Sequence, residues 1–441
     1  MEGQGKTERI FVREQSIPPR PAPVSERGFL GWARANLFSN WINSIITLVS
    51  AYVILDVAWT LFDWAILRAV WSGSNRDACV SADPSVVPGA CWAFVRAKFG
   101  QWVYGLYPVD QRWRVDIVYA VGALALIPML IPRVPYKRAN AIFLLVVYPT
   151  MALILLTGGH FQFSSGTWLT LIVIMLAALG IILFFSLVAG ILELRMSLTN
   201  WAVISGAVLL LFAVLSVDFG LTRVDTPLWG GLLVTLVVAL SGIVASLPLG
   251  ILLALGRRSK LPVVRLFSVM FIELWRGVPL VTVLFMASVV LPLFMPEGTS
   301  IDKLLRAMVG TALFAAAYMA EVVRGGLQAI PRGQYEAADA LGLSYWRKLR
   351  FIILPQALRI VIPGIVNSFL SLFKDTTLVS IIGIFDLLGI LNAGLGDPNW
   401  ASPQTGPTGY FAVALIYLLF CSGISRYSLF IENRLAVGHK R

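Results

Sequence analysis

Ten long apolar stretches run through the 441-residue chain, and they restrict its possible folds more than any other feature. A helix needs about 20 mostly apolar residues to cross a bilayer, and these stretches have that length. Their centres lie near Val53, Ala123, Val147, Ile174, Leu209, Leu240, Val283, Leu313, Ile365 and Ala414. The sequence therefore predicts an all-α integral membrane protein with about ten transmembrane helices.

The charge content agrees with a membrane environment. Charged residues make up 13% of the chain, whereas water-soluble domains average about 25%. The net charge of +12 would suit a nucleic-acid-binding protein only if the basic residues formed one soluble face. Here they lie between apolar segments, so we expect the lipid bilayer, and no nucleic acid, as a partner.

The basic residues also predict an orientation. If the ten segments alternate across the membrane, most Lys and Arg fall on one side, which is the cytoplasmic side by the positive-inside rule. Both termini then lie in the cytoplasm. Residues 1–38 are polar and lack the apolar core of a signal peptide, so we expect a cytoplasmic tail. A long loop near 69–114 faces outward, and its basic residues are a weak exception because long loops cross with less regard to charge.

The cysteines and histidines give little sign of metal or catalytic chemistry. Cys79 and Cys91 share the outer loop, where an oxidising compartment permits a disulfide, but two free thiols are equally compatible with the sequence. Cys421 lies in an apolar segment. The two histidines, His160 and His439, belong to no cluster with metal-ligand spacing. We expect no metal site and no catalytic residue.

A polar stretch, EAADALGLSYWRKLRFIILP, lies between the eighth and ninth predicted helices. Its first residues favour a helix, which Gly342 can end because glycine adopts the left-handed conformation common at helix ends. Ser344 can cap a second short helix, and Pro355 is expected to stop it. The stretch predicts a helix, a turn and a second helix on the cytoplasmic side.

Two interpretations of this stretch are open from its residues. Trp346, Leu349 and Ile353 fall on one helical face, which is typical of an element resting among lipid headgroups. Alternatively, Glu336 and Asp339 are available for ion pairs with a partner protein. The chain contains no G-x-x-x-x-G-K-[ST] phosphate loop, so ATP-driven work would need another polypeptide and a surface on which it docks.

The fixed positions of the stretch match the EAA-x3-G-x9-I-x-L-P signature of importer permeases of the ATP-binding-cassette (ABC) class. They are Glu336, Ala337, Ala338, Gly342, Ile352, Leu354 and Pro355. Residues 271–281, 316–338 and 371–380 are also similar to polar amino acid permeases of the histidine/glutamine type. The departures are Trp275, Val278 and Thr377. The chain most resembles the general L-amino acid permeases, which have an extended N-terminal half.

The resemblance implies a five-helix permease core at 229–434, preceded by about five extra helices at 39–217. It implies that the chain is not an enzyme but a subunit of an ATP-driven importer, which moves amino acids across the bacterial inner membrane into the cytoplasm. ATP and magnesium would be used by a separate cytoplasmic ATPase and not bound by this chain. The other implied partners are a periplasmic amino-acid-binding protein and a second related permease, with a heterodimer favoured over a homodimer.

The resemblance also assigns roles within a cytoplasmic docking loop at 324–355. Glu336 would pair with a basic residue of the ATPase, and Gly342 would provide the turn between the two short helices. Trp346 and Leu349 would be apolar anchors. The ATPase-docking residues are Glu336, Ala337, Ala338, Asp339, Gly342, Trp346 and Leu349.

Charged residues inside the apolar segments are candidates for the substrate path. Glu273 and Arg276, at i and i+3, either form a structural ion pair or place Glu273 toward a cavity where it holds the ammonium of an amino acid. Lys374 and Asp375 diverge by about 100° on a helix. They either contact neighbouring helices and snorkel, or Asp375 or Thr376 takes part in zwitterion binding or gating.

Other charges have simpler expected roles. Glu321 and Arg324 are expected to tie the eighth helix to the docking loop, and Asp56 and Asp63 to lie at helix ends or contacts. The rival function is an ion- or proton-coupled secondary amino acid transporter without an ATPase, with Asp56, Asp63, Glu273 and Asp375 as coupling carboxylates. An intramembrane enzyme would need a nucleophile with a base or a metal cluster, and the sequence offers neither.

Overall fold

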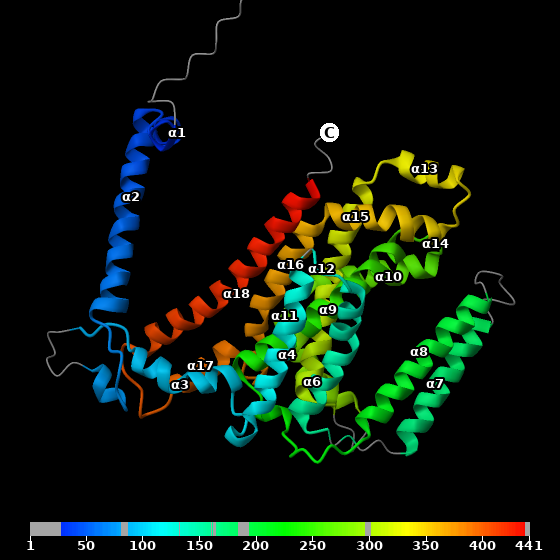
Figure 1. Ribbon diagram of the computed structural model, residues 1–441, viewed down its shortest axis with the longest axis horizontal. Coiled ribbons are helices and arrows are strands. Elements are labelled where there is room, and N and C mark those ends of the chain that lie inside the picture. Colours follow the sequence, from blue (N-terminus) through cyan, green and yellow to red (C-terminus); the bar gives the residue numbers. More distant parts are fainter. Residues whose placement is uncertain are drawn as a thin grey trace, which may run out of the picture. The chain divides into compact units, whose positions relative to one another are not determined.

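The computed structural model describes residues 28–80, 87–131, 133–159, 161, 165–183, 194–295 and 301–436. Among these residues the regular structure is helical (Figure 1), and eight helices are long and apolar enough to cross a membrane, with a bent pair as a possible ninth. The predicted centre at Ile174 falls in a shorter apolar helix, α7 (Ser165–Leu183). The prediction of an all-α protein with about ten membrane helices is confirmed. Residues 1–27, most of the expected tail, lie outside the described part of the chain.

The seventh predicted segment is bent rather than straight. It consists of α10 (Pro262–Gly277), α11 (Leu280–Phe285) and the turns that follow to Phe294, and the two halves meet at 103°. The break falls at Gly277 and Pro279. Proline has no amide hydrogen to continue the helical ladder, and the residue before it is pushed into an extended conformation; Val278 has φ −112° and ψ 135°.

The centre of the C-terminal half is the packing of α9 (Gly231–Arg257) against α12 (Lys303–Ala329). Small side chains let the two backbones approach closely. A Cβ added at Gly250 would lie 2.7 Å from the Cβ of Met319. The remaining helices of this half follow α12 in the chain: α13 (Arg332–Ala340), α14 (Tyr345–Lys348), α15 (Leu354–Ile360), α16 (Ile362–Asp375), α17 (Leu387–Leu395) and α18 (Thr405–Ala436).

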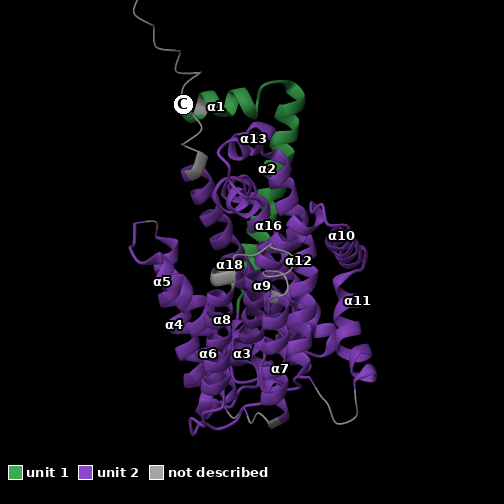
Figure 2. Ribbon diagram, turned by 90° about the vertical axis from the view of Figure 1, so that its right-hand side faces the viewer, with its two compact units in different colours: residues 1–69, 85–90 green, residues 70–84, 91–441 purple. Residues whose placement is uncertain are grey.

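The chain separates into two compact units, which Figure 2 colours differently. One unit contains residues 1–69 and 85–90, with α1 (Gly28–Asn36) and α2 (Trp41–Phe62). In it, Asn40 caps α2 by accepting a 2.8 Å hydrogen bond from the amide of Asn43. Asp63 lies at the end of α2 and pairs with Arg68 at 2.6 Å, as expected of a charge at a helix end.

The other unit contains residues 70–84 and 91–441, which include the expected permease core and most of the expected N-terminal extension. The extension contributes α3 (Trp92–Tyr104), α4 (Arg112–Leu130), α5 (Lys137–Ile142), α6 (Tyr148–Thr157), α7 and α8 (Leu194–Leu215). Tyr107, which precedes α4, is buried and donates a 3.0 Å hydrogen bond to the carbonyl of Leu156. Its cluster includes Leu233 of α9 and Leu284 of α11, so extension and core share apolar packing.

Helix α3 packs against α17 and α18 of the core. Phe94 and Trp102 of α3 share a buried cluster with Leu391 of α17 and Val413 of α18. The Lys98 ammonium pairs with Asp397 at 2.6 Å, and this ammonium lowers the pKa of the Asp397 carboxyl.

A disulfide and two backbone contacts hold the start of α3. Cys79 and Cys91 are joined, with their Cα atoms 5.6 Å apart. The Cys91 amide donates to the Thr408 hydroxyl at 2.8 Å, and the Arg76 amide donates to the carbonyl of Asn399 at 2.7 Å. The loop before α3 is therefore fixed to the chain around the start of α18.

Candidate functional site

The expected helix, turn and helix are present after α12. The first helix, α13, ends at a glycine turn in which Gly342 has φ +69°. The amide of Gly342 donates to the carbonyl of Asp339 at 2.9 Å, and the amide of Leu343 donates to Ala338 at 3.2 Å. These two bonds form a Schellman motif, which places its left-handed residue where only glycine avoids a steric cost.

Polar contacts hold the two short helices together and to α9. Asp339 of α13 forms an ion pair with Lys348 of α14. Arg258, at the end of α9, donates to the Tyr335 hydroxyl at 3.2 Å and to the Leu327 carbonyl at 3.0 Å. Asp339 is therefore engaged inside the loop, and α13 is fixed to the ends of both central helices.

The second helix differs from the prediction at both ends. Ser344 occupies the N-cap position, but its side chain makes no capping hydrogen bond; its carbonyl accepts from the Lys348 amide at 2.9 Å. Pro355 does not stop the helix, because a π-helical turn, Leu349–Ile353, leads directly into α15. The π-helical turn changes which backbone groups pair just before Pro355. Proline lacks a backbone donor, and a local shift of the hydrogen-bond register lets a helix continue through it.

The predicted docking residues divide into exposed and buried sets. Glu336 and Ala337 are exposed, and Trp346 is 61% exposed. Ala338 is buried, and Leu349 is buried in a cluster with residues of α9, α10 and α12. Leu349 therefore contacts this chain's own core and does not share an exposed face with Trp346.

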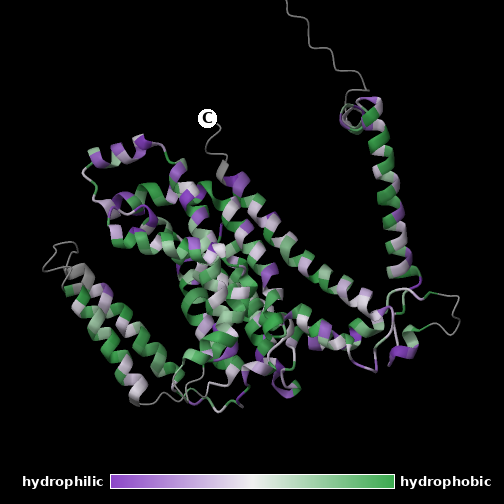
Figure 3. Cartoon of the chain, turned by 180° about the vertical axis from the view of Figure 1, so that it is seen from behind, coloured by the Kyte–Doolittle hydropathy of each residue, from purple (hydrophilic) through white to green (hydrophobic). Residues whose placement is uncertain are grey.

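The loop contains both hydrophilic and hydrophobic segments (Figure 3), and its exposed side is partly apolar. Leu341 is 75% exposed and Tyr345 is 52% exposed, and the Tyr345 ring meets Trp346 edge to face at 5.4 Å. Exposed apolar side chains that lie together on a folded protein often mark an interaction surface. With Glu336, these three residues form what we call the loop surface.

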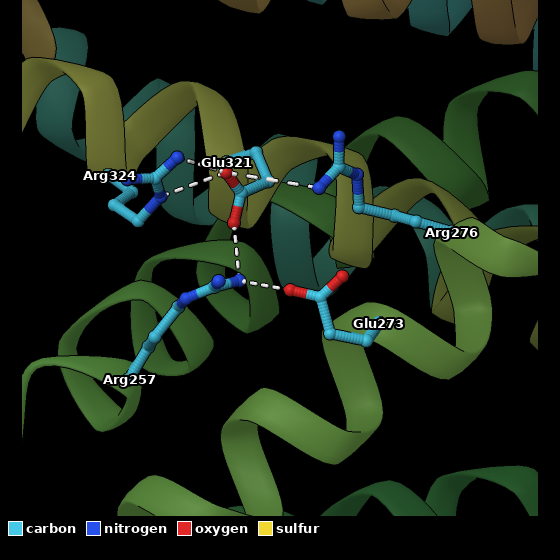
Figure 4. Close-up of polar contacts among 5 residues, drawn as sticks. All are labelled: Arg257, Glu273, Arg276, Glu321 and Arg324. Carbon is cyan, nitrogen blue, oxygen red and sulfur yellow. Dashed lines mark hydrogen bonds and ion pairs between the residues drawn. The ribbon is translucent and has the colours of Figure 1, made fainter.

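Five charged side chains meet at the start of the docking loop (Figure 4). They are Arg257 of α9, Glu273 and Arg276 of α10, and Glu321 and Arg324 of α12. Glu321 lies between three arginines: Arg257 at 2.8 Å, Arg324 at 2.6 Å and Arg276 at 3.9 Å. We call these five residues the arginine–glutamate cluster.

The cluster replaces the Glu273–Arg276 pairing and extends the expected Glu321–Arg324 pair. Glu273 pairs with Arg257 of the preceding helix at 2.9 Å, whereas Arg276 is directed to Glu321 and lies over the Tyr318 ring. Glu321 joins α12 to α9 and α10 in addition to its pair with Arg324. Sequence spacing shows neighbours on one helix, but these partners come from different helices and could not be found that way.

The predicted residues at the end of α16 and just after it have different surroundings. Lys374 is exposed and Asp375 is half-buried. Thr376 is fully buried, and its hydroxyl donates to the Phe373 carbonyl at 2.8 Å. Lys374 is therefore the most solvent-exposed of the three side chains, and the Thr376 side chain is packed in the protein interior.

Sequence analysis missed Asp386, a fully buried carboxylate directly before α17. Its side chain accepts hydrogen bonds from the amides of Gly389 at 2.9 Å and Leu388 at 3.2 Å, and from the Tyr417 hydroxyl at 3.3 Å. Burial raises the pKa of the Asp386 carboxyl. The available signal was an aspartate immediately before an apolar run, which is a helix-start pattern.

Comparisons with known proteins identify the family of the chain. The family model described as "Binding-protein-dependent transport system inner membrane component" matches residues 246–437. The Escherichia coli protein described as "Inner membrane amino-acid ABC transporter permease protein YhdY" is 44% identical over 96% of this chain and 97% of its own length. BztC of Rhodobacter capsulatus is 43% identical over 98% of this chain and 99% of its own length.

A solved structure described as an amino acid ABC transporter with histidines is 28% identical, covers 46% of this chain and 92% of its own, and has a TM-score of 0.41. The chain belongs to the family of amino-acid ABC transporter permeases. It is a multi-pass inner membrane permease of an amino-acid importer, and ATP hydrolysis belongs to a separate chain. Membership implies an ATPase and a binding protein as partners.

Proposed function

We propose that residues 324–355 are the point at which the ATPase acts on this permease. One observation carries the proposal: the loop surface is exposed while the opposite side of the same loop, at Ala338 and Leu349, is buried in the core. A force applied to such an element moves the helices to which it is fixed. Glu336 would supply an ion pair and Trp346 an apolar contact to the ATPase, which binds ATP and magnesium.

The arginine–glutamate cluster provides the path for that movement. Arg324 begins the docking loop and shares Glu321 with Arg257 and Arg276. Displacement of the loop would therefore act on α9, α10 and α12 together. Packed side chains with few alternative arrangements respond to a displacement by switching rather than stretching. We infer that the cluster couples the ATPase to the opening and closing of the permease.

Charge reversal at Glu336 tests the docking role. In proteoliposomes containing the full transporter, Glu336→Lys should lower ATP-driven uptake at least tenfold and reduce co-purification of the ATPase. Glu432→Lys, an acid-to-base change in α18, is the matched control outside the loop. Wild-type uptake by Glu336→Lys would refute the docking role.

For orientation, we propose that both termini and the docking loop face the cytoplasm and the Cys79 loop faces the periplasm. A cysteine introduced at exposed Ser344 should react with a membrane-impermeant maleimide only after the spheroplasts are opened, whereas a cysteine at exposed Val109 should already react in intact spheroplasts. Labelling of both from the same side would overturn this topology.

For assembly, we propose that the permease pairs with a second, related permease rather than with a copy of itself. Support comes from the resemblance to importers that often combine two such chains. Purification from the native membrane through a tag on this chain should yield a second permease in equal amount. Recovery of two differently tagged copies of this chain in one complex would contradict the proposal.

For substrate, we propose acidic amino acids and their amides. The support is BztC, whose description is a glutamate/glutamine/aspartate/asparagine transport system permease and whose match extends along nearly the whole chain. Competition against labelled glutamate uptake by the 20 amino acids would test this. Competition by basic or aromatic amino acids alone would oppose it.

A further inference from the structure

A hollow between α16 and α18 brings two cationic side chains together within the membrane-spanning part of the chain. Its volume is about 370 Å³, and its lining consists of Leu370, Lys374, Cys421, Ser422, Ser425 and Arg426. Leu370 and Lys374 are four residues apart on α16, and the other four recur at helical spacing on α18. Each set therefore covers one face of its helix.

The lining is rich in hydrogen-bond donors and contains no carboxylate. It offers the Lys374 ammonium, the Arg426 guanidinium and the hydroxyls of Ser422 and Ser425. Among the described residues, neither Lys374 nor Arg426 forms an ion pair with an acidic side chain. Asp375 follows Lys374 on α16 and interacts electrostatically with its ammonium, but the two side chains form no ion pair, and adjacent helical residues diverge by about 100°.

Both cations lie well inside their spans. Lys374 is about 16 Å along the chain from Ile382, since Thr376–Ile382 is a 3-10 helix, and Arg426 is about 12 Å from Arg434; Ile382 and Arg434 end the spans 362–382 and 405–434. Charged side chains at such positions face water or a counter-charge and often mark a substrate pathway. This hollow therefore needs an anion or an aqueous opening.

We propose that the hollow binds the two carboxylates of a glutamate-like amino acid during its passage through the permease. One cation matches each carboxylate through charge-assisted hydrogen bonds, the serine hydroxyls add donors, and Leu370 lies against the methylene groups. The volume is within the range of small-molecule sites, about 300–1,000 Å³. This inference rests on the proposed import of acidic amino acids.

The discriminating prediction compares glutamate with glutamine, which has one carboxylate. With a single cation remaining, the carboxylate of glutamine is still matched, whereas the second carboxylate of glutamate is not. Arg426→Gln and Lys374→Gln should each lower initial glutamate uptake at least tenfold and glutamine uptake less than threefold. Arg426→Lys, which keeps the charge, should keep the glutamate-to-glutamine ratio within threefold of wild type.

The experiment uses the full transporter, with its ATPase, binding protein and second permease, in proteoliposomes. Arg434→Gln is the matched control, because it makes the same change on α18 but lies outside the lining; its uptake ratio should stay within twofold of wild type. ATP hydrolysis by each variant is measured in parallel. A rate within twofold of wild type is expected and shows that assembly and ATPase docking are intact.

Three results would overturn the assignment. If Arg426→Gln and Lys374→Gln both kept the wild-type ratio of glutamate uptake to glutamine uptake, while the wild type imported glutamate, only the assignment of the hollow would be refuted. Absence of glutamate and glutamine uptake by the wild type would refute the proposed substrate class with it. If replacing anionic lipid with phosphatidylcholine lowered wild-type uptake of glutamate and glutamine equally, and the two variants did the same, the hollow would be a lipid headgroup site.

Discussion

Replacement of Gly342 is the most direct perturbation of the docking loop. Gly342 has φ +69°, and a Cβ built on it meets no atom within 4 Å. Any cost of a side chain there is therefore conformational and not a clash. A non-glycine residue in the left-handed region costs roughly 1–2 kcal/mol, which corresponds to a factor of about 5–30 in the population of the turn.

Gly333 supplies a control of opposite sign. It is an exposed residue of α13, it also has open space around its Cβ position, and its φ lies outside the left-handed region. Alanine in a helix is about 0.5–1 kcal/mol more favourable than glycine. Gly333→Ala should therefore raise the unfolding temperature of the purified complex slightly, and Gly342→Ala should lower it.

Gly342→Asp should have the larger effect on function, because it adds a charge beside the loop surface to the conformational cost. We expect ATP-driven uptake to be abolished while the protein remains in the membrane at wild-type abundance. The assays are uptake in proteoliposomes and quantification in membrane fractions. Equal shifts of the unfolding temperature for the two alanine variants would refute the turn argument, and wild-type uptake by Gly342→Asp would end the docking hypothesis.

Three further perturbations follow from other contacts. Glu321→Gln should cost about 2 kcal/mol, because the charged acceptor of several arginine hydrogen bonds is lost, and Arg257→Gln in the same chain should recover part of the fall in unfolding temperature. Because the pKa of Asp397 is lowered, its pairing with Lys98 adds stability above pH about 4, the ordinary pKa of Asp. This stability is lost as the pH falls further. Lys98→Met should remove that acid dependence in a thermal-melt series, whereas an unchanged dependence would contradict it. Reduction of the Cys79–Cys91 disulfide, which closes a loop with a sequence separation of 12, should cost about 3 kcal/mol; two thiols reactive with maleimide before any reductant would show that the bridge is absent.

The sequence predicts the membrane segments and the docking turn well because each depends on local chemistry. Bilayer thickness limits apolar length, and Gly342 satisfies a backbone conformation that few other residues adopt. The structure corrects the expectations for Ser344 and Pro355, where a shift of hydrogen-bond register replaced a simple cap and stop. It also corrects the expected partner of Glu273.

The missed features depend on contacts between distant parts of the chain. Arg257 lies on a different helix from Glu273 and Glu321, and no spacing rule connects them. The packing of α3 on α17 and α18 and the burial of Asp386 have the same cause. In contrast, Gly277 and Pro279 indicate a local break between α10 and α11 from the sequence, and only the 103° change of direction is hidden, because hydropathy averages over it.

The position of α3 in the chain has a consequence for synthesis. Lys98 is made 299 residues before its partner Asp397, an interval of about 15–60 s at 5–20 residues per second. During this time the apolar face that includes Phe94 and Trp102 has no α17 or α18 to cover it. The Cys79–Cys91 bridge needs only neighbouring residues, so it can fix the start of α3 early and leave the helix ready for partners that arrive last.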